Sequence, residues 1–322
     1  MDSLHLNTEE DAVAVACSDL SDACVAHVLS FMQTPRDLAS AELACRAWCR
    51  VCEDSSAWLQ MATCHLQGFA ASSQPRLERR LVKRLCGSAL ARPGRGSLLA
   101  EGLAASSTDN PWEHVRNTLT TRLHTMDSYW SSAGGVPADP SWLLYRLCAR
   151  VSVVHSVQAR PYYAIWQDVA HAGRPLYSPL RVRVQLGART SDIGGWSDET
   201  EAVGDDTQWS YTSEAFAVEQ ADVLQTFTLP QPVVCAGGMM RLLFEGRAQQ
   251  QDADQLYYVC IVRARALGTP LYGYRCLANG QLHYDGVDAG RRDAVEAEPS
   301  SEEDDNGDDD DELVVLMSSD EE

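Results

Sequence analysis

The sequence predicts an α+β multidomain chain: a small three-helix unit, an antiparallel β-sandwich and a disordered acidic C-terminal tail. Residues 17–66 repeat apolar side chains at the spacing of one helix face. Residues 98–274 contain at least six short strand-like runs, with turn-rich connections and no 12-residue helical pattern between them. Residues 293–322 hold 15 acids and no base, a composition that does not support a packed core.

Charge and composition exclude several classes of protein. The formal net charge is −20, but without the 15 tail acids the rest of the chain has 31 acids against 26 bases. No clustered positive face indicates a nucleic-acid binder, and no run of 18 apolar residues predicts a membrane span. Residues 1–16 have no secretory pattern and are expected to be a flexible leader. With 11 cysteines, this favours a reducing intracellular compartment, cytoplasmic or nuclear.

Residues typical of helix caps mark the boundaries of the helices in this unit. Thr34 can cap a second helix, with Asp37 at the capping-box position. A third short helix is expected from Asp54 or Ser55. Such a small core usually needs a partner or a neighbouring domain. The first helix shows the i, i+3, i+4, i+7 pattern at Val25, Val28, Leu29 and Met32.

The order of these elements resembles an F-box, although Ser21 stands where that family usually has proline. The resemblance implies a helix-in-groove plug for the Skp-type adaptor of a cullin ubiquitin ligase. The alternative is that all these side chains form an internal core, and some of them must hold the helices together. The matching elements are Leu20, Val28-Leu29-Ser30-Phe31-Met32, Pro35-Arg36-Asp37-Leu38, Cys45-Arg46-Ala47-Trp48 and Trp58. The implied adaptor contacts are Leu20, Val28, Leu29, Phe31 and Leu38.

Residues 67–97 are predicted to connect two domains. Their run RLERRLVKRL predicts a solvated linking helix, the alternative being a membrane-surface or calmodulin-type helix. The CRVC run at 49–52 lacks the second cysteine pair of a structural zinc site, so no metal is expected there. No cofactor is predicted anywhere in the chain.

The strand-rich piece alternates clearly at RVRVQL, with Val182, Val184 and Leu186 expected to point inward. Its recurring pieces are ASSTDN, NTL, YWSS, PLYSP, WSYTS, LPQPVVCAGG and LYYVC. They resemble a discoidin-like, galactose-binding-like jelly roll, and the whole order is similar to a plant and green-algal group of F-box proteins with such a domain. The resemblance covers about residues 17–270. Residues 275–322 are expected to be a C-terminal extension, acidic and disordered from 293.

Ligands of such a sandwich are expected at loops around one end. Tyr162, Tyr163, Trp166 and Tyr177 could form a target-binding platform, because aromatic side chains are favoured at interface hot spots. The alternative is that they seal the open end of the barrel. Oxygens of the 109–110 turn could bind calcium, but a plain turn is the commoner meaning of such a cluster. No phosphate loop, GxSxG or HExxH motif indicates an enzyme.

The acidic tail contains one apolar run, formed by Leu313, Val314, Val315, Leu316 and Met317. It resembles a SUMO-interacting motif, a short aliphatic strand flanked by acids that adds to a sheet edge. Ser318 and Ser319 each precede an acid by three residues and are candidate phosphorylation sites. The tail can equally be a simple solubilising segment.

The leading functional hypothesis is a non-catalytic substrate receptor of an SCF-type ubiquitin ligase. The F-box would bind the adaptor, and loops of the sandwich would bind an unknown target protein. The first alternative is a carbohydrate-binding module tethered by an F-box, which recognises glycoproteins. The second is an adaptor-binding structural protein outside any ligase.

Overall fold

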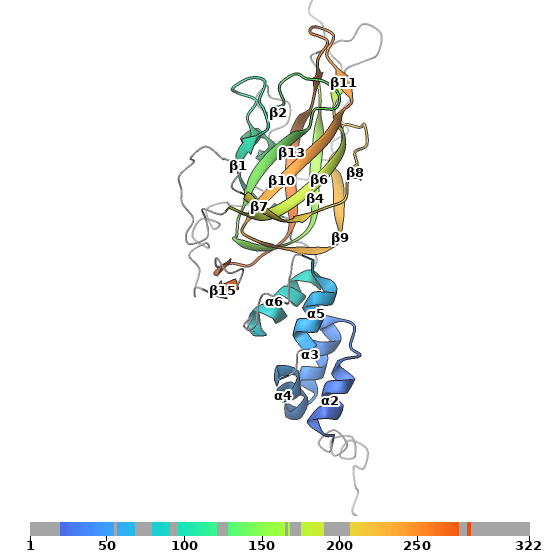
Figure 1. The fold of residues 1–322 in the computed structure, drawn as a ribbon, viewed down its shortest axis with the longest axis vertical. Coiled ribbons are helices and arrows are strands. Elements are labelled where there is room, and N and C mark those ends of the chain that lie inside the picture. The colour runs from blue at the N-terminus through green and yellow to red at the C-terminus, as the bar shows by residue number, and fades with distance from the viewer. Residues whose placement is uncertain are drawn as a thin grey trace, which may run out of the picture.

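The computed structural model describes residues 20–54, 57–67, 79–90, 94, 96–120, 128–164, 167, 175–189, 207–276 and 282–284. Figure 1 shows the helices gathered at one end of an elongated body and the sandwich at the other. No helix in the described part of the chain combines the length and apolar character needed to cross a membrane.

Within the described residues, five helices form the first part of this body. Ser21 caps the first one, since its side chain accepts a hydrogen bond from the Cys24 amide at 3.3 Å. Thr34 caps the next, accepting from the Asp37 amide at 3.1 Å and donating to the Asp37 carboxylate at 2.7 Å. The capping predicted for Thr34 and Asp37 is therefore confirmed. The helices are α2 (Asp22–Leu29), α3 (Pro35–Ala44), α4 (Arg46–Asp54), α5 (Ala57–His65) and α6 (Arg79–Leu90).

The prediction of three helices between residues 17 and 66 is wrong, because the described residues there form four. The chain breaks at Cys45, whose backbone is extended with φ −161° and ψ 168°. This break separates α3 from α4. The break lets α4 turn back and pack beside α2 and α3.

The second part is a sandwich of two antiparallel sheets, as predicted. One six-stranded sheet has the order β1-β3-β10-β6-β7, with β8 paired to β6. The facing five-stranded sheet has the order β2-β13-β4-β5, with β9 paired to β4. The first sheet uses β1 (Leu99–Ala105), β3 (Ser141–Leu147), β6 (Pro179–Arg189), β7 (Thr207–Thr212), β8 (Phe216–Ala217) and β10 (Met239–Arg247). The second uses β2 (Trp130–Ser131), β4 (Val151–Tyr163), β5 (Leu176–Tyr177), β9 (Gln225–Ala236) and β13 (Cys260–Pro270).

Side chains from both sheets fill the space between them. The predicted inward residues Val182, Val184 and Leu186 are buried there, and Trp130 and Phe244 stack with ring centroids 6.2 Å apart. Burying these apolar surfaces is the main stabilising term for a sandwich of this kind. The 3-10 helix η2 (Val115–Leu119) closes one side, where the Thr118 and Tyr145 hydroxyls are hydrogen-bonded at 2.8 Å.

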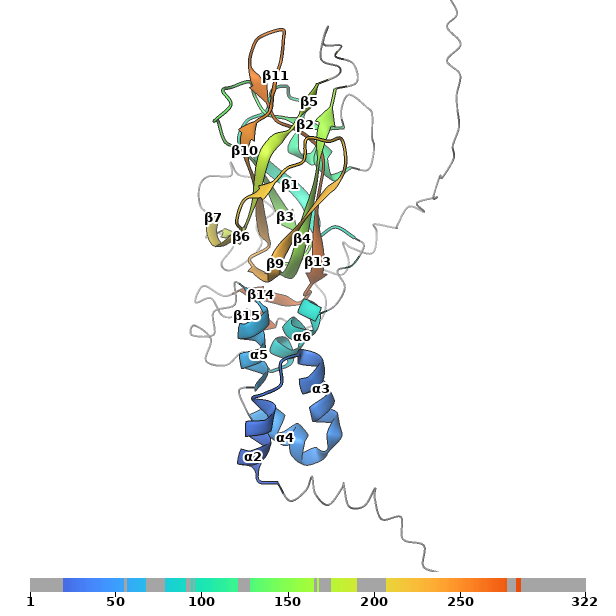
Figure 2. The same ribbon diagram turned by 90° about the vertical axis from the view of Figure 1, so that its right-hand side faces the viewer.

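Small strand pairs extend the sandwich at both ends. β11 (Gln249–Gln250) and β12 (Tyr257–Tyr258) form a hairpin at the end far from the helices. β14 (Tyr274–Cys276) and β15 (Leu282–Tyr284) pair near the helices, and Figure 2 shows them between the sandwich and α5. The two ends of the sandwich therefore have different neighbours.

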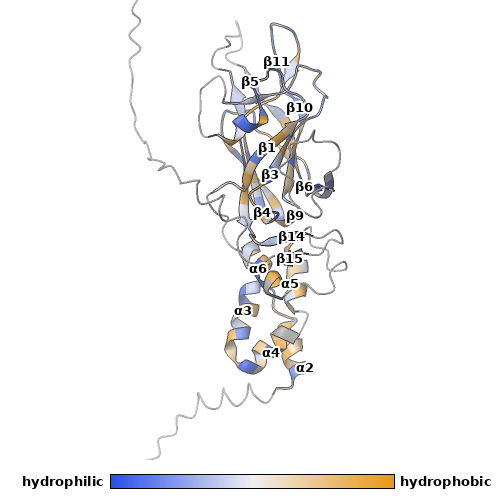
Figure 3. Ribbon diagram, turned by 90° about the vertical axis from the view of Figure 1, so that its left-hand side faces the viewer, coloured by the Kyte–Doolittle hydropathy of each residue, from blue (hydrophilic) through white to orange (hydrophobic). Residues whose placement is uncertain are grey.

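The predicted solvated connector is a buried joint instead. On α6, Leu81, Leu85 and Cys86 are 1%, 0% and 0% exposed. They belong to one apolar cluster that also contains helix residues and, from the base of the sandwich, Val151, Val153, Val234, Leu271 and Tyr274. Figure 3 colours parts of α5 and α6 as hydrophobic close to this base. The charged residues of α6 had suggested a solvated helix, but its apolar face is covered on two sides. We call this cluster the joint.

Polar contacts fix the joint in register. The Gln67 amide donates to the Pro232 carbonyl at 3.0 Å, and the Val234 amide donates to the Gln67 carbonyl at 2.9 Å. The carboxylate of Glu42 on α3 accepts from the Trp58 indole and pairs with Lys83 on α6, both at 2.7 Å. Each contact joins segments that are distant in sequence, so the joint resists both sliding and rotation.

We expect Leu85→Ala to lower the free energy of unfolding by about 2–5 kcal/mol, because it leaves a cavity in the joint. Urea denaturation checks this, followed by far-UV circular dichroism for the helices and tryptophan fluorescence for the sandwich. Both probes should move together. Leu43→Ala is the matched control, since Leu43 is 87% exposed. Equal stability of the two variants would contradict a shared core.

Candidate functional site

Exposed apolar side chains lie on α2 and at its two ends. Leu20, Val28 and Phe31 are 42%, 42% and 70% exposed, which is unusual for large apolar residues beside a core. Cys24 is also exposed. Cys24 and Val28 are four residues apart on α2 and lie on one side of it. Leu20 comes just before the Ser21 cap, and Phe31 lies in the turn after the helix. We call Leu20, Cys24, Val28 and Phe31 the α2 stripe.

The structure corrects two of the five adaptor contacts predicted for this region. Leu29 and Leu38 are 2% and 0% exposed, so this chain's own helices cover their side chains. Leu29 lies on the face of α2 that also buries Val25, and Leu38 lies on the buried face of α3. They hold the helices together, whereas Leu20, Val28 and Phe31 remain available for a partner.

Local contacts keep Phe31 on the outside. The Phe31 amide donates to the Val28 carbonyl at 3.1 Å in the tight turn that follows α2. The ring then meets the His27 ring edge-on, with centroids 4.9 Å apart and planes at 82°. Ser21 departs from the family pattern, in which proline is usual, but it caps the N-terminus of α2. The helix that carries the stripe therefore still begins at Asp22.

The opposite end of the sandwich holds the predicted aromatic residues. Tyr162 and Tyr163 end β4 and are half-buried. Tyr162 stacks on Tyr129, with centroids 3.9 Å apart and planes at 14°. Trp166 lies outside the described residues. Tyr162 and Tyr163 thus lie at the end of the sandwich where the sequence predicts target binding.

The prediction that Tyr177 belongs to a binding platform is wrong, since its side chain is 4% exposed. Its ring meets Tyr258 edge-on at 6.1 Å, and its hydroxyl donates to the Gln167 side chain at 2.6 Å. Burial raises the pKa of Tyr177 to about 12. For Tyr177 the alternative hypothesis holds: its aromatic ring helps to close the end of the barrel.

Arg247 organises the loops at this end, and sequence reasoning did not single it out. It is 6% exposed. Its guanidinium donates to the carbonyls of Ala133 and Tyr257 at 2.8 and 2.7 Å, to the Asp139 carbonyl at 3.3 Å and to the Ser141 hydroxyl at 3.2 Å. Burial lowers its pKa. One side chain therefore ties the 133–141 loop to the β12 hairpin.

Carboxylates gather at the same end. Asp109 and Glu113 come from the turn after β1, and Asp252 and Asp254 come from the hairpin between β11 and β12. Burial and the charge of Asp254 raise the pKa of Asp109. Hydrogen bonds from the Tyr258 hydroxyl and the Leu256 amide lower the pKa of Asp254. We call these four residues the acidic end.

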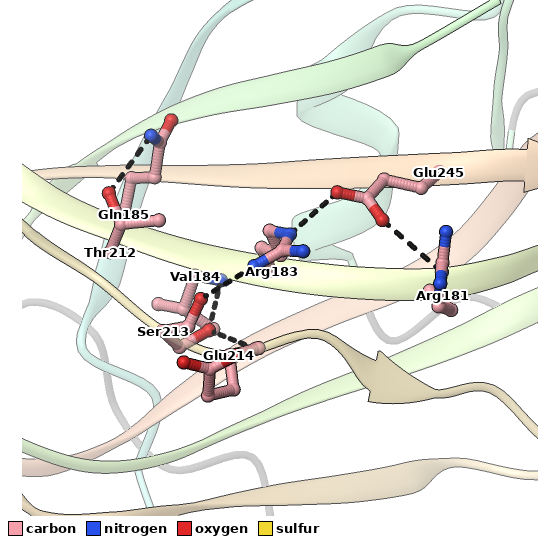
Figure 4. A network of polar contacts seen from close by, with 8 residues as sticks. All are labelled: Arg181, Arg183, Val184, Gln185, Thr212, Ser213, Glu214 and Glu245. Carbon is pink, nitrogen blue, oxygen red and sulfur yellow. Dashed lines mark hydrogen bonds and ion pairs between the residues drawn. The ribbon is translucent and has the colours of Figure 1, made fainter.

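Arginines on the outer face of the six-stranded sheet are committed to cross-strand contacts. Glu245 pairs with Arg183 at 2.6 Å and with Arg181 at 3.2 Å, as Figure 4 shows. Arg241 lies over Trp209, with its guanidinium carbon 4.5 Å from the ring centroid. The contacts are partly buried and serve sheet pairing. The arginines on this face therefore stabilise the sheet, and we do not assign a binding site to it.

Two expectations concern other parts of the chain. In the part of the chain that the structure describes, no group of three or more His, Cys, Asp or Glu side chains is arranged to hold a metal ion. The SUMO-interacting candidates Leu313, Val314, Val315 and Leu316, with the phosphorylation candidates Ser318 and Ser319, lie outside the described residues. The tail motif stays a prediction.

Comparison with known proteins identifies the helical unit. Residues 22–63 match the family model F-box-like. The chain is 35% identical over 187 residues to an F-box protein of Arabidopsis thaliana, a match that covers 54% of this chain and 48% of that protein. The chain thus spans about half the length of this curated relative. The predicted F-box resemblance is confirmed: the chain carries an F-box-like domain at its helical end and has an F-box protein as a homologue.

The sandwich is similar to solved carbohydrate-binding and discoidin domains. A family 32 carbohydrate-binding module from C. perfringens, solved with galactose, is 13% identical, with a TM-score of 0.32 and coverage of 51% of this chain and 90% of that one. Discoidin II of Dictyostelium discoideum is 10% identical, with a TM-score of 0.33 and coverage of 53% and 56%. Both TM-scores are low, and the strand pairings of this chain establish its architecture by themselves.

We expect Arg247→Met to lower the free energy of unfolding by at least about 2 kcal/mol, because buried carbonyls lose their donor. The unfolding midpoint in urea measures this effect. Arg50→Met is the control: Arg50 is 61% exposed and pairs with Asp22 on the surface at 2.8 Å. That loss should stay within about 1 kcal/mol. If the control is as damaging as Arg247→Met, the loops do not depend on this side chain.

Proposed function

We propose that this chain is a non-catalytic substrate receptor of an SCF-type ubiquitin ligase, with the α2 stripe binding the Skp-type adaptor. The observation that carries the proposal is the division of the F-box-like helices into two sets of apolar side chains. Leu29 and Leu38 complete the internal core, while Leu20, Val28 and Phe31 stay exposed beside it. The buried side chains already complete the core of these helices, so the exposed set is free to contact a partner.

The energetics favour a groove-shaped partner. Burying one large apolar side chain contributes about 1.5–3 kcal/mol. Phe31 is 70% exposed and has the most apolar surface to lose within the stripe. An aromatic anchor of this kind at the centre of a contact carries much of the binding energy. The helix-in-groove mode suits a short helix that carries exposed apolar side chains on one side and at its ends.

The far end of the sandwich is the proposed place for a target protein. It lies at the opposite end of the body from the helices, so adaptor and target would not compete for space (Figure 1). The joint supports this role, because its shared core and its Gln67 contacts fix the sandwich relative to the helices. A receptor built in this way acts by proximity: it holds a target near the ligase chemistry and performs none itself.

We expect Phe31→Ala to weaken binding of a purified Skp-type adaptor by at least about tenfold, because the anchor is lost. Isothermal titration calorimetry on the full chain measures this. Val136→Ala is the matched control: Val136 is 56% exposed and belongs to the sandwich, so its loss should leave adaptor affinity unchanged.

Stability separates the two possible meanings of a weakened complex. Phe31→Ala should keep the unfolding midpoint, since the ring is largely outside the core. Failure of the unsubstituted chain to bind any Skp-type adaptor would overturn the ligase role. Equal weakening by Val136→Ala would remove the stripe as its carrier.

A further inference from the structure

We propose that this chain resists attachment of ubiquitin to its own lysine when it works in a ligase, because its single lysine, Lys83, is held inside the joint. This inference rests on the proposed receptor function. A subunit of a ligase is held close to the charged conjugating enzyme, so its own amines compete with those of the target. A receptor that is not modified in its own complex remains available for further targets.

Lysine is almost absent from the sequence. Of the 26 basic residues, 25 are arginine and one is lysine. Ubiquitin transfer needs a neutral amine, whose nitrogen attacks the thioester carbonyl carbon of the charged enzyme. A carbon–nitrogen bond forms, the carbon–sulfur bond breaks, and the leaving thiolate takes up the proton that the amine releases. A guanidinium keeps its proton in proteins, so the arginines do not supply this nucleophile.

Arginine occupies exposed cationic positions in the described part of the chain. The side chains of Arg50, Arg116 and Arg181 are 61%, 62% and 60% exposed. Each forms a surface ion pair of a kind that lysine can also make. A lysine at such a position would place an amine within reach of the enzyme. These positions therefore carry the positive charge without the nucleophile.

Three helices meet at the amine of Lys83. Its Nζ atom, on α6, lies 2.7 Å from Oε1 of Glu42 on α3 and 5.6 Å from the ring centroid of Trp58 on α5. The Trp58 indole donates to the same Oε1 atom at 2.7 Å, which fixes the carboxylate. The side chains of Lys83 and Glu42 are 32% and 14% exposed. The amine thus ends on a carboxylate that is mostly buried.

Attack on a thioester requires the Lys83 side chain to leave both contacts. The ion pair and the cation–π contact must break, and the four-carbon stem must turn outward. The neighbouring side chains Val82 and Leu85 are 4% and 0% exposed, so α6 cannot rotate to present the lysine without opening the joint. The reaction at Lys83 is therefore slow while the joint is closed.

The test moves the lysine from the joint to the surface of the full chain. Lys83→Arg removes the amine, keeps a positive charge beside Glu42 and serves as the lysine-free control. Lys83→Arg combined with Arg116→Lys places the single lysine on η2, and Lys83→Arg combined with Arg181→Lys places it on β6. The unsubstituted chain and the three variants have the same net charge, so electrostatic attraction to the enzyme is matched.

Acetylation with an N-hydroxysuccinimide ester measures access to the amine without any ligase. We expect Lys83 to react about tenfold more slowly than the lysine introduced in either double variant, because two contacts must break first. Mass spectrometry of timed samples gives the rates. Equal rates would overturn the proposal, since the contacts would then not protect the amine.

Ubiquitination in a reconstituted SCF complex measures the consequence, with lysine-free ubiquitin and no target added. We expect the unsubstituted chain to gain no more ubiquitin than Lys83→Arg, and at least one double variant to gain ubiquitin at its introduced lysine. Mass spectrometry locates each attachment. Attachment at Lys83 as efficient as at an introduced lysine would overturn the proposal. Lack of attachment in both double variants would also overturn it, because the joint would then not be the cause.

Glu42→Gln tests which contact holds the amine. The amide oxygen can still accept from the Trp58 indole, so the unfolding midpoint should hold while acetylation of Lys83 becomes at least about threefold faster. An unchanged rate would remove Glu42 from the protection. Adaptor affinity measured on the same samples separates the two proposals. An unsubstituted chain that binds no adaptor overturns the receptor role, whereas efficient attachment at Lys83 with intact adaptor binding overturns the protection alone.

Discussion

The structure depends on apolar contact across the joint. α6 has no core of its own, and its buried residues Leu85 and Cys86 fill the space between the F-box-like helices and the base of the sandwich. Without that contact, two small units would each expose an apolar face to water. Removing this surface from water therefore fixes how the F-box-like helices sit on the sandwich, and with it the placing of the two candidate binding surfaces.

Local features of the sequence predict much of this fold, because they act through neighbours in the chain. The cap formed by Thr34 and Asp37 and the alternation of Val182, Val184 and Leu186 need no distant partner to be recognised. The burial of α6 could not be read in the same way. Its charged and apolar positions indicate a face, but only the tertiary structure supplies the strands that cover it.

The candidate sites show the same limit. Phe31 and Leu29 are two residues apart in one family pattern, yet Phe31 is exposed and Leu29 is buried. Leu29 ends α2 on its buried face, whereas Phe31 lies in the turn that follows. Arg247 gains its role from carbonyls more than 100 residues earlier in the chain, such as that of Ala133. Lys83 stands in a charged run of the sequence, and its confinement becomes visible only when side chains of α3 and α5 are placed beside it.

β4 has a geometric consequence for the whole molecule. It begins at Val151 inside the joint and ends at Tyr163 beside the acidic end, without interruption. At about 3.3 Å per residue, this single strand is a strut about 40 Å long. A tilt of only about 5° at its foot would swing its tip by roughly 3 Å, about the length of one hydrogen bond. The orientation of the loops at the far end is therefore set by how tightly the helices pack against the start of β4.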